Sequence, residues 1–332
     1  MIGRVLRVLL ALLIIVGIAA WIWGPREPVD REIAFDAAAL PDDLDAWVAE
    51  SEATVPSLRA GAEKRIVWAG TPGVQTPLAL VYVHGFSASA EEIRPVPDRV
   101  AEELGANLFF ARLTGHGRDG PAMAEADAGA WIEDLAEAMA VGRRLGERVI
   151  LIGTSTGGTL AILAAHDPLL SEGLAGLVLV SPNFAVNNPA APLLTFPWAR
   201  DFLPWLVGEE RSFEPHNEGH GLHWTTRYPT EAVLPMAALV THVRRLDHVE
   251  QEMPAMFLYS EHDKVIVPAA VREVHDRWGG PKGLHTFVMG RGDDPSSHVI
   301  AGDILSPGHT DRAVSLIVDW AHSIADASQA AE

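Results

Sequence analysis

Residues 148–158 read Arg-Val-Ile-Leu-Ile-Gly-Thr-Ser-Thr-Gly-Gly. Residues 149–152 are a short, β-branched apolar run of the kind that forms a buried strand. The run ends in a Gly-x-Ser-x-Gly pattern at residues 153–157, and residues 159–165 favour a helix. Strand, tight turn and helix in this order are typical of a nucleophile elbow, which lifts the serine hydroxyl clear of the sheet. The alternative is a glycine-rich connector with an incidental Ser155, but the flanking strand and helix favour the elbow.

Composition limits the function classes. The 332 residues suffice for one large α/β domain with an insertion or for two smaller domains. Apolar residues make up 48% and charged residues 21%, which excludes wholesale disorder. The formal net charge of −19 argues against nucleic acid as a partner and against a surface that adheres to anionic lipid. The chain has no cysteine, so disulfides and thiolate metal sites are excluded.

The N-terminal segment has the pattern of a membrane span. Residues 8–23 are an unbroken apolar run that follows Arg4 and Arg7 and ends with Trp21 and Trp23. Apolar length, a basic flank and tryptophans near the water interface predict a transmembrane anchor.

A cleaved signal peptide is the alternative interpretation of residues 1–23. The apolar run is long for a signal peptide, and bulky Trp21 follows a poor cleavage site at residues 18–20. We therefore favour an anchor whose basic end stays in the cytoplasm, which places the catalytic body on the extracytoplasmic (periplasmic) side. Without the two arginines of the anchor, the charge of the body falls from −19 to −21.

Strand and helix patterns alternate after a linker and an N-terminal helix at residues 24–63. This alternation predicts an α/β fold with a mostly parallel sheet and helices on both faces. Its core comprises residues 64–182 and 231–326. Strands are predicted at residues 65–68, 78–83, 107–113, 149–152, 174–180, 255–260 and 284–289. Helices are predicted at residues 90–104, 131–145, 159–165, 233–246, 269–278 and 310–325.

Residues 183–230 interrupt the alternation. They are rich in proline and aromatic residues, too apolar for a disordered linker and too irregular for another strand–helix unit. We expect an inserted cap, or lid, over the C-terminal edge of the sheet. Its Trp198, Trp205 and Trp224 are predicted to bind the acyl part of a substrate, because a surface loop rarely exposes so many aromatic side chains without a reason. The alternative is that they pack only among themselves and onto the sheet as a small satellite core.

A serine nucleophile needs a base and a carboxylate that orients the base. Asp263 follows the predicted strand at residues 255–260, where a loop can aim it inward; Glu261 and Asp247 are its rivals. Triads on serine elbows of this kind follow the chain order Ser, Asp, His, which excludes every histidine before Asp263. Of the remaining histidines, His298 and His309 lie outside predicted strands and helices. We prefer His298, because His309 lies too close to the start of the last helix.

An oxyanion hole needs two backbone N–H donors. Thr156, directly after the serine, is predicted to supply one, and Phe86, in the loop after the strand at residues 78–83, the other. His84 and His116 are expected to hold loops by hydrogen bonds. The histidines show no metal-ligand spacing. His216, His220 and His223 come closest, but their acidic surroundings indicate a wet surface.

These motifs together resemble the α/β-hydrolase superfamily, within it the carboxylesterase and monoacylglycerol-lipase-like branch. The resemblance covers residues 64–325. The features that carry it are the His-Gly-Phe run at 84–86, the Leu-Thr-Gly-His-Gly run at 113–117, the elbow at 153–158, the Glu-His-Asp run at 261–263 and His298. It implies Ser155 as nucleophile, Asp263 as acid and His298 as base. Thr154 and Thr156 depart from the commoner elbow residues, which affects the expected substrate, not the mechanism.

The sequence therefore predicts a membrane-anchored serine hydrolase that cleaves carboxylic esters of apolar acids through an acyl-enzyme. Its partners would be a small-molecule ester or lipid and the membrane, with no nucleic acid, cofactor or metal. An amide, thioester or C–C bond hydrolase on the same triad is the alternative. A non-catalytic binding protein that retains the fold is a second alternative, but such proteins usually lose a triad member.

Overall fold

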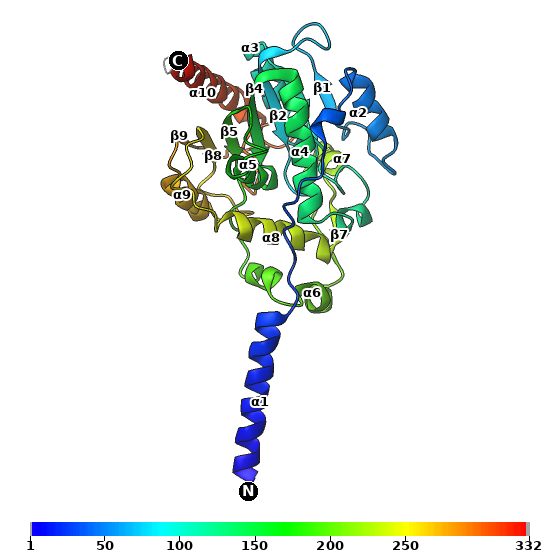
Figure 1. The fold of residues 1–332 in the computed structure, drawn as a ribbon, viewed down its shortest axis with the longest axis vertical. Helices are drawn as coiled ribbons and strands as arrows, with labels where there is room; N and C mark the ends of the chain where they lie inside the picture. Colours follow the sequence, from blue (N-terminus) through cyan, green and yellow to red (C-terminus); the bar gives the residue numbers. More distant parts are fainter. Residues whose placement is uncertain (1, 330–332) are drawn as a thin grey trace.

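The computed structural model describes residues 2–329. Within these residues a seven-stranded sheet has the order β1-β3-β2-β4-β5-β8-β9 (Figure 1). Neighbouring strands are parallel, except that β1 is antiparallel to β3. A second, two-stranded sheet pairs β6 with β7. The strands are β1 (Arg65–Val67), β2 (Thr76–Val83), β3 (Asn107–Phe110), β4 (Gly146–Thr154), β5 (Leu174–Val180), β6 (Glu210–Ser212), β7 (Arg227–Pro229), β8 (Ala255–Tyr259) and β9 (Lys282–Thr286).

Helices cover both faces of the large sheet. On one face α4, α5, α8 and α9 contribute to the core, and on the other α3 and α10 do so. The α-helices are α1 (Ile2–Trp23), α2 (Leu44–Ala53), α3 (Val96–Leu104), α4 (Ala128–Leu145), α5 (Thr156–His166), α6 (Ala199–Val207), α7 (Glu218–His223), α8 (Val233–Val243), α9 (Pro268–Arg277) and α10 (Thr310–Gln329). Short 3₁₀ helices are η1 (Ala37–Ala39), η2 (Ala90–Ile93), η3 (Pro121–Ala124), η4 (Ala191–Thr195), η5 (Thr230–Ala232) and η6 (Pro307–His309).

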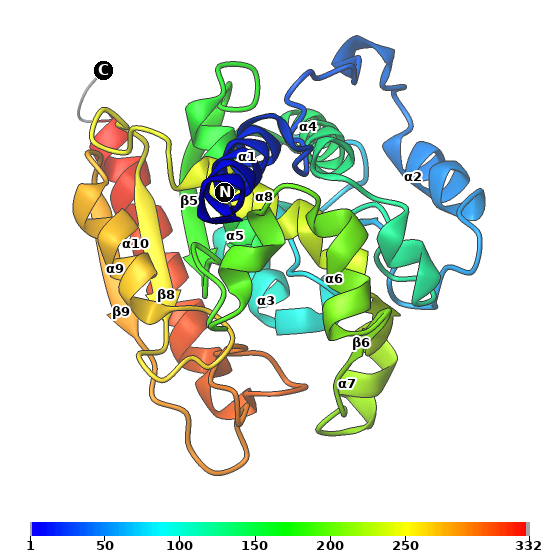
Figure 2. The same ribbon diagram turned by 90° about the horizontal axis from the view of Figure 1, so that it is seen from below.

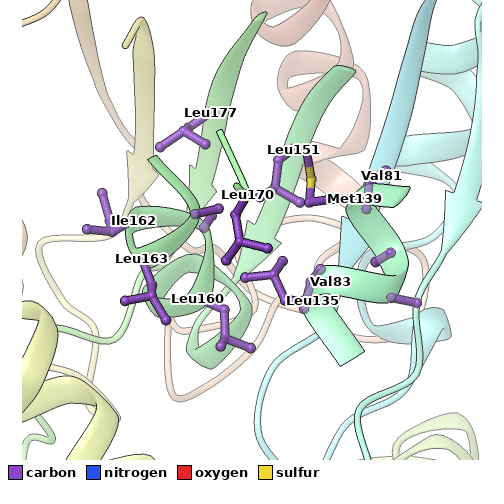
Figure 3. Close-up of a cluster of buried hydrophobic side chains, with 14 of the residues drawn as sticks. Val81, Val83, Leu135, Met139, Leu151, Leu160, Ile162, Leu163, Leu170 and Leu177 are labelled. Atoms are coloured by element: carbon purple, nitrogen blue, oxygen red, sulfur yellow. The ribbon is translucent and has the colours of Figure 1, made fainter. Parts of the chain in front are cut away.

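The central strands are apolar on both faces, because each face is covered by helices. Successive side chains point to opposite faces. Val81 and Leu151 are register partners in the hydrophobic cluster on the face covered by α4, α5, α8 and α9, which we call the first cluster. Leu80 and Ile150 are register partners in the second cluster, on the face covered by α3 and α10. Figure 3 shows the first cluster, in which side chains of α4 and α5 meet those of the sheet. Each buried side chain of this size stabilises the fold by about 1.5–3 kcal/mol.

The structure confirms the predicted mostly parallel sheet with helices on both faces. The predicted strand at residues 174–180 coincides with β5. The predicted helix at residues 90–104 is instead divided into η2 and α3. Pro95 and Pro97 cause the division, because proline has no backbone N–H and cannot continue a helix. The last strand, β9, begins and ends earlier than predicted, at Lys282 and Thr286.

Residues 183–230, which we call the cap, contain only short elements between β5 and α8: η4, α6, β6, α7, β7 and the start of η5. The cap contacts the loops that follow two strands of the sheet. Its Thr225 N–H donates to the carbonyl oxygen of Ser87, after β2, at 2.7 Å, and Val186 forms an isolated bridge with Ile266, after β8. The cap therefore lies at the C-terminal edge of the sheet.

Helix α1 extends away from the rest of the molecule (Figure 1), and Figure 2 shows it end-on. Residues 4–23 have a mean hydropathy of 2.7, and none of the apolar window is buried. The C-terminal end of α1 contacts the cap. The Trp198 N–H donates to the carbonyl oxygen of Pro25 at 2.8 Å, and the rings of Trp21 and Phe196 meet edge to face with centroids 4.9 Å apart.

Candidate active site

Ser155 lies in a strained turn between β4 and α5. Its φ of 52° and ψ of −110° are unusual for a residue with a Cβ atom, and such conformations cost on the order of 1–3 kcal/mol. Backbone contacts from the neighbouring strand hold the turn. The Ser155 N–H donates to Val180 O at 2.9 Å, and Ser155 O accepts the N–H of Asn183 at 3.0 Å. This is the geometry of a nucleophile elbow.

The two glycines that flank Ser155 are required by close packing. A Cβ atom at Gly153 would lie 2.3 Å from Gly157 O, and one at Gly157 would lie 2.1 Å from Val83 O. Both distances are far below van der Waals contact. The first turn of α5 can therefore press against the ends of β4 and β2 only if both positions lack a side chain.

Asp263 and His298 form a buried pair. His298 Nδ1 lies 2.7 Å from Asp263 Oδ2, although the two residues are 35 positions apart. The other carboxylate oxygen, Oδ1, accepts the backbone N–H groups of Val265 at 2.7 Å and Ile266 at 2.9 Å. Asp263 therefore orients the imidazole with Nδ1 as the protonated nitrogen, which leaves Nε2 able to accept a proton.

Asp294, which the sequence analysis did not identify, positions His298. Its Oδ2 accepts the N–H groups of His298 at 2.8 Å and Val299 at 2.9 Å. The hydroxyl of Ser181 donates to the His298 carbonyl oxygen at 2.7 Å. The loop is thus fixed from both its N–H and C=O sides. The sequence feature that could have identified Asp294 is its position, four residues before the predicted base His298.

The electrostatics suit His298 as a base. Burial disfavours the charged imidazolium and lowers the pKa of His298, but attraction to Asp263, together with their hydrogen bond, raises it. Glu92 and Asp294 add to the increase. The net pKa of His298 is above its ordinary value. An imidazolium formed during proton transfer is therefore stabilised by the negative groups around it.

The rival residues of the sequence analysis lie in other environments. Glu261 accepts a hydrogen bond from Tyr259 and pairs with Arg272. Asp247 is exposed and accepts the N–H of Val249. His309 Nε2 lies 3.2 Å from Asp293 Oδ2. Of the carboxylates considered, Asp263 is the one that the structure pairs with His298.

The loop after β2 lies directly against Ser155. A Cβ atom at Gly85 would lie 3.1 Å from Ser155 Cβ. Burial lowers the pKa of His84 to about 4, so its imidazole is neutral at neutral pH. Because Nε2 accepts the Leu113 N–H at 3.2 Å, Nδ1 carries the proton and donates to Gly85 O at 2.9 Å. The Gly85 carbonyl and the Phe86 N–H belong to the same planar peptide and point in opposite directions. The hydrogen bond from His84 to this carbonyl therefore also fixes the direction of the Phe86 N–H.

The N–H groups of Phe86 and Thr156 make no hydrogen bond to other residues between positions 2 and 329. Thr156 is the first residue of α5, and an N–H at this position has no partner within the helix. Two unpaired donors beside a serine can bind a developing oxyanion. His84 and His116 both contact this loop, as a loop-holding role requires: the His84 ring centroid lies 5.0 Å from that of His116, and the His116 centroid lies 5.7 Å from that of Phe86.

Glu92, which is not among the site residues predicted from the sequence, is a buried carboxyl beside the same loop. Its Oε2 accepts the Gly85 N–H at 2.7 Å and the Tyr82 hydroxyl at 3.1 Å. Tyr82 Oη is also 3.1 Å from Thr154 Oγ1. Burial raises the pKa of Glu92 to about 7. The sequence feature that could have identified Glu92 is an acidic residue in the predicted helix at residues 90–104, a few positions after the loop at 84–86.

Ser155, His298 and Glu92 line one cavity of about 610 Å³ between the sheet and the cap. One wall is apolar and consists of Val186, Leu194, Leu203, Val207, Val233 and Met236. The rest of the lining includes the polar and aromatic side chains of Ser87, Phe213, Glu214, His216, His220 and Trp224. The cavity beside Ser155 therefore offers both apolar side chains that suit an acyl chain and polar ones that suit a more polar group.

Two of the three predicted acyl-binding tryptophans are misplaced. Trp224 is buried and lines the cavity, but Trp198 and Trp205 do not line it and are 48% and 87% exposed. For Trp205, the periodicity of α6 is the reason. Leu203 turns inward to the cavity, and a residue two positions later lies about 200° around the helix axis, on the opposite face.

The prediction of a wet surface at the cap histidines is wrong for His220. This residue is 7% exposed, stacks on Phe213 with ring centroids 5.3 Å apart, and lines the cavity. Its Nδ1 accepts the N–H of His216 at 3.2 Å. Acidic neighbours in the sequence did not indicate exposure, because α7 turns His220 inward and leaves Glu218 outside.

Comparisons with known proteins show the family of this chain. A family model described as "Serine aminopeptidase, S33" matches residues 75–290, more than half of the chain. The thermostable monoacylglycerol lipase of Bacillus sp. (strain H-257) is 27% identical over 195 residues, which are 58% of this chain and 73% of the lipase.

Two solved structures have a similar fold. One comes from work on the metagenome-derived lipolytic enzymes LipS and LipT. It has a TM-score of 0.62 at 22% identity and covers 78% of this chain and 98% of its own. The other is a soluble variant of the monoglyceride lipase of Saccharomyces cerevisiae in complex with a substrate analog. It has a TM-score of 0.59 at 12% identity and covers 89% and 99% of the two chains.

Proposed function

The chain belongs to the α/β-hydrolase family described as serine aminopeptidase, S33, and we propose that it is a serine hydrolase that cleaves carboxylic esters of apolar acids. The observation that carries this proposal is the arrangement around one cavity. Ser155 lies in a strained elbow there, and His298, paired with Asp263 at 2.7 Å, lines the same space.

In the proposed reaction the Ser155 hydroxyl attacks the ester carbonyl carbon, and His298 Nε2 accepts its proton. The negative oxygen of the tetrahedral intermediate accepts hydrogen bonds from the Phe86 and Thr156 N–H groups. The imidazolium then donates its proton to the departing alcohol, which leaves Ser155 acylated. A water molecule, deprotonated by His298, releases the acid and restores the serine.

The apolar wall supports an acyl lipid or a similar ester as substrate. Leu194, Leu203 and Val207 from the cap and Met236 from α8 offer an acyl chain a surface without charge. Each methylene that this wall buries contributes about 0.8 kcal/mol, or roughly fourfold in binding. The names of the Bacillus and yeast relatives, both lipases of monoacylglycerols, point to the same class of substrate.

For the rest of the chain, we propose that residues 1–23 anchor the body in a membrane, with Arg4 and Arg7 in the cytoplasm and the catalytic body on the extracytoplasmic side. Residues 64–182 and 231–326 then form the catalytic core, and residues 183–230 form the cap. Helix α1 supports the anchor, since it is long and apolar enough to cross a bilayer. A signal peptide has the same properties near an N-terminus.

An active-site fluorophosphonate probe tests the catalytic proposal. The wild type should become labelled on the peptide that contains Ser155, and Ser155→Ala should lose both labelling and hydrolysis of p-nitrophenyl octanoate. The activity loss should be on the order of 10⁴-fold or more, at unchanged thermal stability. A Ser155→Ala protein that keeps a few per cent of the activity would contradict the assignment. A second variant, His298→Ala, distinguishes the proposed base from His309.

Fractionation of cells that make the full chain tests the anchor. The protein should remain in the membrane pellet after a high-salt wash. Mass spectrometry of the purified protein should find the N-terminal peptide with Arg4 and Arg7. A mature N-terminus near Ala20 or Trp21 would instead establish a cleaved signal peptide.

The family description favours one second function, release of an N-terminal amino acid from a peptide. Such a substrate carries an α-ammonium group, and Glu92, Glu214 and Asp294 place carboxyl groups on the cavity wall. Comparison of kcat/KM for aminoacyl p-nitroanilides and p-nitrophenyl octanoate decides between the two. Faster hydrolysis of the anilides would assign the peptidase function.

A further inference from the structure

A second cavity, of about 740 Å³, lies where α1 meets the cap. Its wall comes from four segments: the last turn of α1, the linker after it, η4 with the following residue, and the C-terminal half of α8 with Arg245 just after it. The lining residues that matter here are Trp21, Arg26, Phe196, His242 and Arg245. Nothing in the proposed reaction uses this cavity, and none of these residues lines the catalytic one.

The charge around this cavity differs from that of the protein as a whole. The chain has a net charge of −19, yet Arg26 and Arg245 form no ion pair with a carboxylate between residues 2 and 329. The lining carboxylate, Glu27, is already bound through both oxygens by Arg200, at 2.6 and 3.2 Å. Two guanidinium groups thus line this space with no carboxylate left to neutralise them. The Arg26 guanidinium donates to the Trp21 carbonyl oxygen at 2.7 Å and lies over the Trp21 ring, 5.3 Å from its centroid, so its positive charge is held at the end of α1.

His242 indicates that the positive charge is concentrated here. Its Nε2 is buried and has no hydrogen-bond partner among the described residues. Burial, together with repulsion from Arg31 and Arg245, lowers the pKa of this histidine. An anion in the cavity would accept hydrogen bonds from the guanidinium groups and offset this repulsion.

The position of the cavity identifies the source of the anion. The Trp21 ring belongs to the cavity wall and to the last turn of the apolar helix. Tryptophans at the end of a membrane span lie at the level of the lipid headgroups. If α1 spans a bilayer, the cavity therefore opens at the depth of the lipid phosphates, next to apolar ring surface that suits the first carbons of an acyl chain.

We propose that this cavity binds the phosphate group of a membrane phospholipid through Arg26 and Arg245. The planar guanidinium fork matches two phosphate oxygens, so arginine suits this ligand better than lysine does. A bound phospholipid would join α1, the linker and α8 through a single ligand. The inference rests on the proposed membrane anchor and is independent of the proposed esterase activity.

The test uses the full chain in maltoside micelles, which contain no phosphate. Short-chain phosphatidylglycerol, the matched glucosyl diacylglycerol and inorganic phosphate are titrated separately, with the thermal unfolding midpoint and native mass spectrometry as readouts. We expect the phospholipid to raise the midpoint by about 2–5 °C with saturation and to add one lipid mass. The glucosyl lipid should do neither.

The double variant Arg26→Gln, Arg245→Gln should weaken phospholipid binding about tenfold or more, because two charge-assisted hydrogen bonds are lost. Arg291→Gln, an exposed arginine that lines neither cavity, is the matched control and should bind like the wild type. Equal stabilisation by the glucosyl lipid, or unchanged binding by the double variant, would overturn the proposal. Stabilisation by inorganic phosphate alone would overturn the lipid as the ligand.

Failure of this proposal can be distinguished from failure of the others. Hydrolysis of p-nitrophenyl octanoate in the same micelles reports on the active site, and the double variant should retain it. The N-terminal peptide of the purified protein reports on the anchor. A chain that keeps α1 but binds no phospholipid therefore refutes the headgroup site alone.

Discussion

Glu92 Oε2 accepts the backbone N–H of Gly85 at 2.7 Å, and the same oxygen accepts the hydroxyl of Tyr82. Tyr82 in turn contacts Thr154, the residue before the proposed nucleophile. One buried carboxyl therefore connects the loop that presents the Phe86 N–H to the strand that presents Ser155. The threonine that departs from the commoner elbow sequence has a role in this network.

Glu92→Leu should lower kcat because the buried Gly85 N–H loses its acceptor, whereas the Tyr82 hydroxyl keeps Thr154 Oγ1 within reach at 3.1 Å. One unpaired donor costs about 1–3 kcal/mol, which corresponds to a loss of about 10- to 100-fold if the cost falls on the transition state. Glu92→Gln keeps an oxygen acceptor and should restore most of the rate. Steady-state kinetics with p-nitrophenyl octanoate, at matched thermal stability, measures both. Full activity of Glu92→Leu would show that the loop is held without it.

The acid limb of the kcat/KM profile should follow His298, since the protonated imidazole cannot accept the serine proton. The pKa of His298 is raised, so the limb should lie above the ordinary value of 6.5 for histidine. Three carboxyl groups raise the pKa of His298: Asp263, Asp294 and Glu92. Glu92→Gln removes one of them and should move the limb to lower pH by a few tenths of a unit up to about one.

The matched control for this shift is Glu147→Gln, because Glu147 is exposed and lies near the opposite end of β4 from Ser155. Its acid limb should coincide with that of the wild type. A limb that stays in place in Glu92→Gln, or moves to higher pH, would contradict the electrostatic coupling between Glu92 and His298.

The acyl preference should respond to Val207 and not to Trp205. Val207→Trp places a large ring on the apolar wall of the cavity, so each methylene that it excludes should reduce kcat/KM roughly fourfold. The ratio of octanoyl to acetyl ester hydrolysis should therefore fall. Trp205→Ala, on the opposite face of α6, should leave the ratio unchanged. A drop in the ratio for Trp205→Ala, with none for Val207→Trp, would assign the acyl site to the outer face of the cap.

Gly157→Ala should destabilise the fold. The new Cβ atom would lie 2.1 Å from Val83 O, and backbone at such a site moves at a cost of at least about 1–3 kcal/mol. Gly70→Ala is the control, because a Cβ atom at that position would meet no other atom within 4 Å. The midpoint of denaturant unfolding measures both variants. Equal midpoints would mean that α5 can shift away from β2 without strain.

Local patterns in the sequence predicted the elements that local physics determines. The buried run at residues 149–152, the glycines around Ser155 and the alternation of strands and helices gave the parallel sheet and the elbow, because strand, turn and helix preferences depend on neighbouring residues. The choice of His298 over His309 rested on element order, and the structure places His298 beside Asp263.

Tertiary structure alone decided which side chains the cap turns toward the cavity. Composition showed that residues 183–230 are aromatic, but Trp205 and Leu203 differ in exposure because they lie on opposite faces of one helix. The roles of Glu92 and Asp294 could not be predicted from the sequence for a related reason. Their hydrogen bonds go to backbone N–H groups of loops, and a loop's path depends on the packing of elements far apart in the chain, which no short stretch of sequence records.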